Sequence, residues 1–152
     1  MPISQDLIQA FAPRGVLRVA LNHGNRVLVA RDDEGRAMGI AVDLATALAD
    51  HLGLQLTFVE YERAVDVSST AEADEWDVCF LAVDPERAKT IAFTEPYVRI
   101  EGCYLAGAHS GAGTSDALIA SGAKVGTVKG SAYTLTLQRK PGAEDLIVYP
   151  DI

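Results

Sequence analysis

The sequence predicts an α/β fold built as two lobes. An alternating apolar segment, an amphipathic segment with a helical period and a second alternating segment follow one another between residues 15 and 58. A second strand–helix–strand series occupies residues 124–149. This order is typical of βαβ units, which cross over right-handed and pair their strands in parallel. With 152 residues, 49% of them apolar, the chain can bury one sizeable core or two small ones.

The first lobe is expected to begin with a strand over residues 17–21, where large apolar residues alternate with polar or small ones. Two short apolar segments around the polar stretch 31–36 then predict a hairpin or tight loop. From Asp43 the apolar period becomes helical, and Gly53 marks the end of that helix. A second strand follows over residues 54–58.

The helix that begins at Asp43 carries a leucine stripe, with alanines 41, 45 and 49 beside it. We expect it to share one core with the strands of the first lobe. The expected core members are Leu17, Val19, Leu44, Leu48, Leu56, Phe58, Val78 and Phe80. Residues 63–75 predict a helix that Ser68–Thr70 interrupts, and the apolar run 77–82 predicts a buried strand.

The character of the chain changes after Pro96, where a second, less regular lobe is expected. Strands are predicted at 98–100, 103–106, 124–128 and 145–149, and helices at 116–121 and 131–138. We therefore expect an N-terminal extension at 1–14, a first lobe at 15–95 and a second lobe at 96–152.

Composition excludes several classes of function. A formal net charge of −8 argues against a nucleic-acid surface, which needs clustered cations, and the loose group Lys124, Lys129, Arg139 and Lys140 indicates a solvated face. No apolar run approaches the roughly 20 residues of a membrane span. The histidines lack the spacing of a metal site, and no cofactor motif is present. Cys79 and Cys103 lie in apolar runs and are expected to be small buried residues.

The residues at the amino terminus lack the basic region and apolar core of a secretory signal. Two explanations stay open. Either the export signal is absent from this chain, or the protein stays in the cytoplasm.

The stretch Asp84–Arg87 places a cation at an expected helix start. Asp84 suits the N-cap position and Pro85 the first helical position. Arg87 in the first turn would oppose the helix dipole by about 0.3 kcal/mol or more, so an anion bound there is the simplest reason for it. The alternative is an ordinary surface ion pair with Glu86, Glu95 or Asp84.

Four segments of the chain resemble the type II periplasmic solute-binding proteins, in particular the branch that binds polar amino acids. They are residues 15–20, residues 39–53, residues 77–82 with the Pro-Glu-Arg motif at 85–87, and Phe-Thr-Glu-Pro-Tyr at 93–97. The resemblance implies two α/β lobes with a cleft between them. It also implies that the second lobe is incomplete here, because members of this family continue for several more elements past the point where this chain stops.

The resemblance also assigns ligand contacts. Arg87 would hold the ligand's carboxylate through its planar fork, and the backbone N–H groups of Gly130 and Ser131 would hold the same carboxylate from the second lobe. For Ser131, simple helix capping is an equal alternative. Asp84 would either pair with a ligand ammonium group or cap its own helix. Asn22 and Tyr97 complete the expected set, although the loop after the first strand lacks the aromatic residue that relatives often place over the ligand.

Three functions follow from this interpretation. The first is a non-catalytic protein that binds an amino acid or related organic acid and delivers it, in the periplasm, to an ABC-type uptake transporter. The second is a dehydratase on the same scaffold that acts on a cyclic carboxylic acid, with Glu95 or Asp84 transferring a proton. The third is a truncated module without a ligand that dimerises through the open edge of its second sheet.

Overall fold

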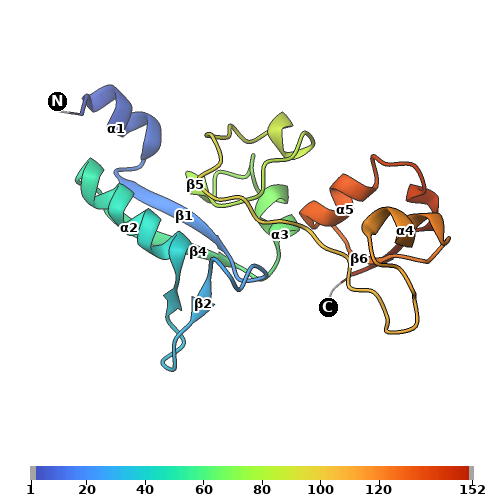
Figure 1. The fold of residues 1–152 in the computed structure, drawn as a ribbon. Helices are drawn as coiled ribbons and strands as arrows, with labels where there is room; N and C mark the ends of the chain where they lie inside the picture. The colour runs from blue at the N-terminus through green and yellow to red at the C-terminus, as the bar shows by residue number, and fades with distance from the viewer. Residues whose placement is uncertain (1–2, 151–152) are drawn as a thin grey trace. The chain divides into compact units, whose positions relative to one another are not determined.

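The computed structural model describes residues 3–150, and these form two units. Unit 1 comprises the described residues up to Ala82 together with Arg87–Ala92. Unit 2 comprises Val83–Glu86 together with the described residues from Phe93 onward. The first two residues of the expected extension and the last two of the expected second lobe lie outside the described residues. Figure 1 follows the elements of each unit along the chain.

Unit 1 contains a three-stranded parallel sheet in the order β4-β1-β5. β1 (Val16–Asn22) pairs with β4 (Gln55–Tyr61) along its whole length. On its other side β1 pairs with β5 (Val78–Cys79) through two residues only. The predicted parallel βαβ unit is thus confirmed. The strand expected at 77–82 is much shorter than predicted.

Helix α2 (Ile40–Leu52) joins β1 to β4 and lies along one face of these strands (Figure 1). It begins three residues before Asp43, where the helical period was expected to start. Gly39 precedes it with φ +115°, and a Cβ atom there would lie 2.7 Å from the Leu28 carbonyl oxygen, so only glycine fits. At the other end Gly53 adopts the left-handed conformation and its N–H donates to Ala49 and Asp50, which confirms the predicted stop.

The core of unit 1 differs from the expected core, because α2 packs against the sheet with a different face. Its buried members are Leu17, Val19, Leu21, Leu28, Val29, Ala41, Ala45 and Ala49. Five expected members pack against this cluster while only partly buried: Leu48, Leu56, Phe58, Val78 and Phe80. Leu44 was wrongly placed in the core, since it is 39% exposed. The alanine stripe faces the sheet instead, because small side chains let the helix backbone approach closely.

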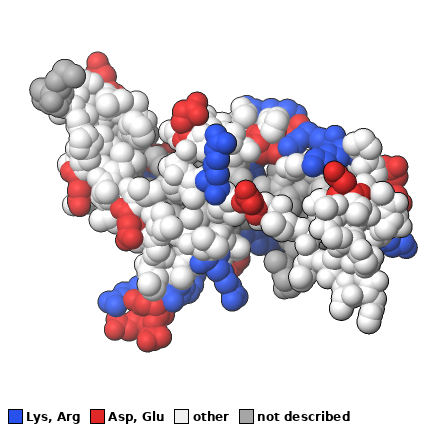
Figure 2. Space-filling model, in the orientation of Figure 1, with Lys and Arg blue, Asp and Glu red and all other residues white. Residues whose placement is uncertain are grey.

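The remaining elements of unit 1 are short. β2 (Ala30–Arg31) and β3 (Ala37–Met38) form the predicted hairpin, and Figure 2 shows acidic and basic side chains gathered at its tip. α3 (Ala64–Ser69) stops within the Ser-Ser-Thr segment expected to interrupt it. α1 (Gln5–Phe11), which was not predicted, begins where Ser4 accepts a hydrogen bond from the Leu7 N–H. The helix expected after Asp84 is a single 3-10 turn, η1 (Arg87–Lys89).

Unit 2 contains the second predicted strand–helix–strand series. β6 (Gly126–Val128) and β7 (Ile147–Tyr149) pair in parallel, and α5 (Ala132–Leu137) lies between them in sequence and packs on β6. α4 (Ser115–Ala120) precedes β6, and the turn η2 (Ala143–Asp145) precedes β7.

Two expectations for unit 2 are wrong. Residues 98–106 form no strand, because alternation alone does not make one without a pairing partner, and Leu105 is fully exposed. Cys103 is exposed rather than buried, for the same reason.

No helix within residues 3–150 is long and apolar enough to cross a membrane.

Candidate functional site

The carboxyl edge of the unit 1 sheet is the place where a ligand site is expected. From β1 the chain passes through α2 to β4 on one side, and then returns to β5 on the other side. This reversal makes a topological switch point between β1 and β5. In open parallel sheets, ligands bind outside the carboxyl ends of the strands at such a point. The residues that follow β1 and β5 are therefore the first candidates.

Asn22 ends β1 at this edge and is only 8% exposed. Its Oδ1 accepts a hydrogen bond of 3.1 Å from the Gly24 N–H, and its carbonyl accepts another from the Asn25 N–H. A Cβ atom on Gly24 would lie 2.9 Å from the Glu62 carbonyl oxygen, so the turn is held close to the end of β4. Asn22 thus shapes the loop at the candidate site.

Arg87 lies beyond the carboxyl end of β5 and is 4% exposed. Its NH1 donates a hydrogen bond of 3.0 Å to the Ala82 carbonyl, which folds the side chain back along the segment that leaves β5. Burial raises the pKa of the Cys79 thiol to about 11, and the positive charge of Arg87 acts in the opposite direction. The guanidinium is therefore close to the end of β5. The contact of Arg87 with a ligand stays a prediction.

A charged group on the β4 side of the same edge was missed by the sequence analysis. His23 Nε2 lies 2.8 Å from Glu60 Oε2, and Arg31 NH1 lies 2.5 Å from the same oxygen. The contacts join the loop after β1, the hairpin strand β2 and the end of β4. The predicted strand stopped at residue 58, so Glu60 was not placed at the carboxyl edge. The acidic residues at 60 and 62, on either side of Tyr61, were the sequence feature that could have indicated this charged cluster.

A second network fastens the end of β4 to α3 and the chain before β5. The Tyr61 hydroxyl donates to Glu75 at 2.6 Å, and Thr70 donates to that hydroxyl at 3.2 Å. Trp76 Nε1 in turn donates to Thr70 Oγ1 at 3.0 Å. Burial, and then the hydrogen bond to Glu75, raise the pKa of Tyr61. Tyr61 therefore stays protonated at neutral pH and acts as a structural donor.

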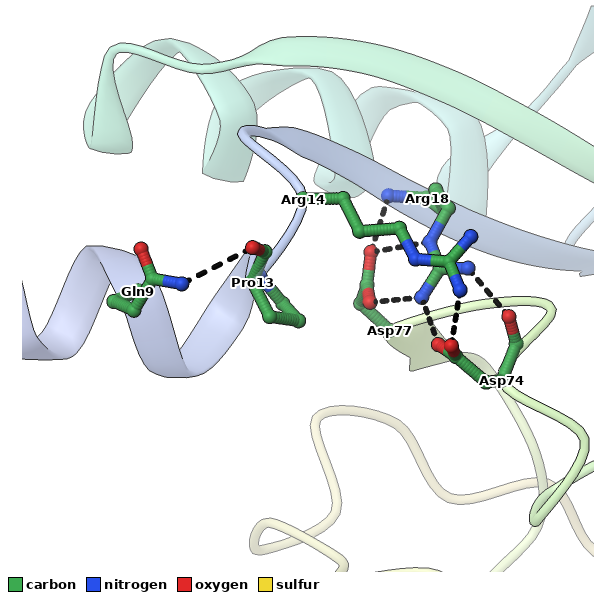
Figure 3. Close-up of polar contacts among 6 residues, drawn as sticks. All are labelled: Gln9, Pro13, Arg14, Arg18, Asp74 and Asp77. Carbon is green, nitrogen blue, oxygen red and sulfur yellow. Dashed lines mark hydrogen bonds and ion pairs between the residues drawn. The ribbon is translucent and has the colours of Figure 1, made fainter.

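The opposite, amino-terminal edge of the sheet carries a cluster of two arginines and two aspartates (Figure 3). Arg18 donates to Asp77 through Nε at 3.0 Å and NH2 at 2.6 Å, and its backbone N–H donates to the same carboxylate at 2.9 Å. Asp74 contacts both Arg18 and Arg14, and its pKa is lowered chiefly by the hydrogen bond from Arg18. Because Asp77 directly precedes β5, this cluster fixes β5 against β1 and is structural.

The predicted contacts in unit 2 surround the start of α5. Ser131 is its N-cap, with Oγ accepting a hydrogen bond of 3.1 Å from the Thr134 N–H, and Gly130 precedes it with φ +70°. The capping role of Ser131 is confirmed. Its contact with a ligand carboxylate stays a prediction. Tyr97, also in unit 2, is 51% exposed.

Asp84, in unit 2, is the most deeply buried of the predicted site residues, at 2% exposed. Its Oδ1 accepts a hydrogen bond of 2.9 Å from the Glu86 N–H, as a residue that begins a turn does. Its Oδ2 accepts a hydrogen bond of 2.7 Å from Arg139 NH2, an ion pair that the sequence analysis did not anticipate. Arg139 was assigned there to a solvated face. In fact it supplies the countercharge of a buried carboxylate.

Solved structures with a similar fold include amino-acid-binding proteins. The holo arginine-binding protein of T. maritima has a TM-score of 0.67 at 21% identity, over 97% of this chain and 64% of that one. The arginine-bound form of domain 1 of the same protein has a TM-score of 0.52 at 26% identity, over 63% of this chain and 73% of that one. An ancestral amino acid-binding protein, a precursor of cyclohexadienyl dehydratase, has a TM-score of 0.50 at 29% identity, over 60% of this chain and 41% of that one.

The chain thus spans 41% of the ancestral protein and 64% of the arginine-binding protein. No curated protein sequence matches it significantly. The model of one protein family matches residues 17–124, which covers unit 1 from residue 17 onward and about half of unit 2. Its match over most of the chain agrees with the periplasmic-binding-protein-like α/β architecture, and the chain belongs to the bacterial extracellular solute-binding proteins, family 3.

Proposed function

We propose that this protein binds a small carboxylate-bearing solute, an amino acid or a related organic acid, as the binding component of an ABC-type uptake transporter in the periplasm. The observation that carries the proposal is the buried guanidinium of Arg87 beside the carboxyl end of β5, at the β1/β5 switch point. This is a cation at the edge of the sheet where parallel α/β proteins bind ligands.

Arginine suits this role for a physical reason. Its planar fork matches the two oxygens of a carboxylate, and such charge-assisted pairs are about twice as strong as neutral hydrogen bonds. The arginine-bound structure of domain 1 of the T. maritima protein supports the view that such a lobe holds ligand contacts of its own.

Further contacts are proposed from both units. Asn22 would shape the loop beside Arg87, and the backbone N–H groups of Gly130 and Ser131 would donate to the ligand. Tyr97 is proposed as an apolar contact, since its ring is half exposed.

A dehydratase is the second candidate, and one observation favours it. The ancestral protein that is 29% identical to this chain is a precursor of cyclohexadienyl dehydratase. The two acids considered for proton transfer differ in environment, because Asp84 is paired with Arg139 whereas Glu95 is exposed. Incubation with a prephenate-like acid separates the candidates, since loss of that substrate requires an enzyme and a binding protein leaves it unchanged.

Calorimetric titration against a panel of amino acids, dicarboxylates and monocarboxylates tests the proposed function. We expect saturable binding by at least one member. Arg87→Lys retains the charge but loses the fork, so affinity should fall at least about tenfold, or 1.4 kcal/mol. Arg99→Lys, at an exposed position of unit 2, is the matched control and should bind like the wild type. Folded protein that binds no member of the panel would contradict the proposal.

A further inference from the structure

The carboxylate of Glu60 joins three segments at the carboxyl edge of the unit 1 sheet. Glu60 pairs in register with Leu21 of β1, one residue pair before both strands end. One of its oxygens, Oε2, lies 2.8 Å from His23 Nε2 and 2.5 Å from Arg31 NH1. His23 begins the loop after β1, residues 23–29, and Arg31 is the last residue of β2. A single oxygen thus connects the loop, the hairpin and β4.

The loop after β1 is also fastened through its backbone at both ends. At its start the His23 N–H donates to the Tyr61 carbonyl at 2.9 Å. Towards its end Leu28 is buried, and the Leu28 carbonyl accepts the Ala41 N–H of α2 at 3.1 Å. Between these anchors the chain runs over the surface, where Val27 is 69% exposed. The His23 imidazole adds a side-chain anchor to this loop close to its start.

The exposure of the three side chains indicates what this anchor does. The His23 side chain is 7% exposed, whereas those of Glu60 and Arg31 are 37% and 42% exposed. An enclosed polar ring needs a hydrogen-bond partner, and without Glu60 the imidazole would gain one by turning out towards water, which moves the loop. An ion pair as exposed as that of Glu60 and Arg31 adds little to folding stability. The Glu60 carboxylate is therefore expected to affect the position of the loop more than the folding of unit 1.

Asn22, which directly precedes His23, connects this anchor to the candidate site. Asn22 is buried at the carboxyl end of β1, and it accepts hydrogen bonds from the N–H groups of Gly24 and Asn25. We propose that Glu60 is a positioning residue, which holds His23 and so fixes Asn22 and the loop after β1 for ligand binding. This inference rests on the proposed function, because it requires that the ligand binds at the β1/β5 switch point.

Calorimetry tests the effect of Glu60 on binding, with arginine, glutamine, glutamate, glutarate and propionate as probes. Glu60→Ala removes the carboxylate, so the affinity for the probe that binds most tightly should fall at least tenfold. Glu60→Gln keeps an acceptor oxygen for His23 and should lose less affinity than Glu60→Ala. Glu62→Ala is the matched control and should bind like the wild type, because the Glu62 side chain is 78% exposed and lies 3.6 Å from Arg31.

The outcomes separate this inference from the proposed function. Wild-type affinity in folded Glu60→Ala overturns the positioning role and leaves the proposed function intact. A wild-type protein that binds none of the probes contradicts the proposed function itself, and the positioning role is then decided without ligand.

Amide hydrogen exchange tests the position of the loop in the protein without ligand. The His23 N–H should exchange at least tenfold faster in Glu60→Ala than in the wild type, because the loop loses its side-chain anchor. The Gly53 N–H at the end of α2 should keep its rate, whereas a general loss of stability would speed up both amides. Glu62→Ala should change neither rate. An unchanged His23 rate overturns the proposal, and if Glu60→Ala does not fold, the same two rates in Glu60→Gln decide.

Discussion

Unit 1 and unit 2 use the same strand–helix–strand order, yet their interiors differ. In unit 1 β1 and β4 pair over seven residues each, and a cluster of buried aliphatic side chains fills the space under α2. In unit 2 β6 and β7 pair over three residues each. The buried side chains there include a single leucine, Leu118, and the two threonines Thr127 and Thr134. The large apolar residues exposed in unit 2 are Val83, Tyr97, Val98, Ile100, Leu105, Ile119, Tyr133, Ile147, Val148 and Tyr149.

The difference shows that a shared topology does not guarantee a shared source of stability. Apolar burial contributes roughly 25 cal/mol per Å², so the leucines and valines of unit 1 supply a driving force that the exposed residues of unit 2 do not. The interior of unit 2 depends more on hydrogen bonds, whose net contribution is about 1 kcal/mol each. Unit 2 is therefore expected to open at a lower free energy than unit 1.

The largest expected effect is in the core of unit 1. Leu17→Ala removes a fully buried side chain near the start of β1, and should lower the free energy of unfolding by about 2–5 kcal/mol. The only tryptophan in the sequence, Trp76, lies in unit 1, so its fluorescence during urea unfolding reports this unit. An unchanged fluorescence midpoint would show that β1 is not the core strand.

The next largest effect is expected at the amino-terminal edge of the same sheet. The Asp77 side chain is 6% exposed and accepts three hydrogen bonds from Arg18, whose side chain is 13% exposed. Asp77→Asn keeps the shape but leaves the arginine without its main countercharge, and should cost about 3 kcal/mol. The measurement is again Trp76 fluorescence in urea. Asp33→Asn, at the exposed hairpin tip, is the control and should stay within about 0.5 kcal/mol of the wild type.

A smaller effect is expected from the polar interior of unit 2. Thr134 Oγ1 donates to the Val128 carbonyl, and it lies 2.8 Å from Thr127 Oγ1. Thr134→Val retains the volume but leaves these two groups without that hydroxyl, which should cost about 1–3 kcal/mol. Far-UV circular dichroism, which reports both units, should show the loss, whereas the Trp76 transition should hardly move. Equal shifts in both signals would mean that the two units unfold together.

The sequence predicts those parts of the fold that depend on local patterns, and it misses those that depend on packing and strand pairing. The sequence predicted β1 and β4 because alternation of apolar and polar residues marks a half-buried strand. It predicted the end of α2 at Gly53 because glycine commonly ends helices. The early start of α2 and its alanine face depend on how closely the helix approaches Leu28, which periodicity does not reveal. Residues 98–106 alternate like a strand, but pairing is a tertiary property.

The candidate site shows the same limit. Arg87 was singled out by a local motif and by the family resemblance, and Asn22 by the resemblance, because each of these signals lies within a short segment of the chain. The ion pairs of Glu60 with His23 and Arg31, and of Asp84 with Arg139, join residues far apart in sequence. All three pairs depend on how strands and helices pack together. A single sequence therefore indicated the candidate arginine but not these long-range ion pairs.

The smallest effect is expected at Leu105, which is 101% exposed in a segment of unit 2 without regular structure. Leu105→Ser removes an apolar side chain that contributes no buried area, so the free energy of unfolding should change by less than about 0.5 kcal/mol in both fluorescence and circular dichroism. Leu17→Ser, the same chemical change inside unit 1, is the matched contrast. A loss above about 1 kcal/mol for Leu105→Ser would mean that this leucine is buried in solution, since only burial gives a leucine such weight. Unit 2 would then have an apolar interior of its own, and the contrast between the two units would fail.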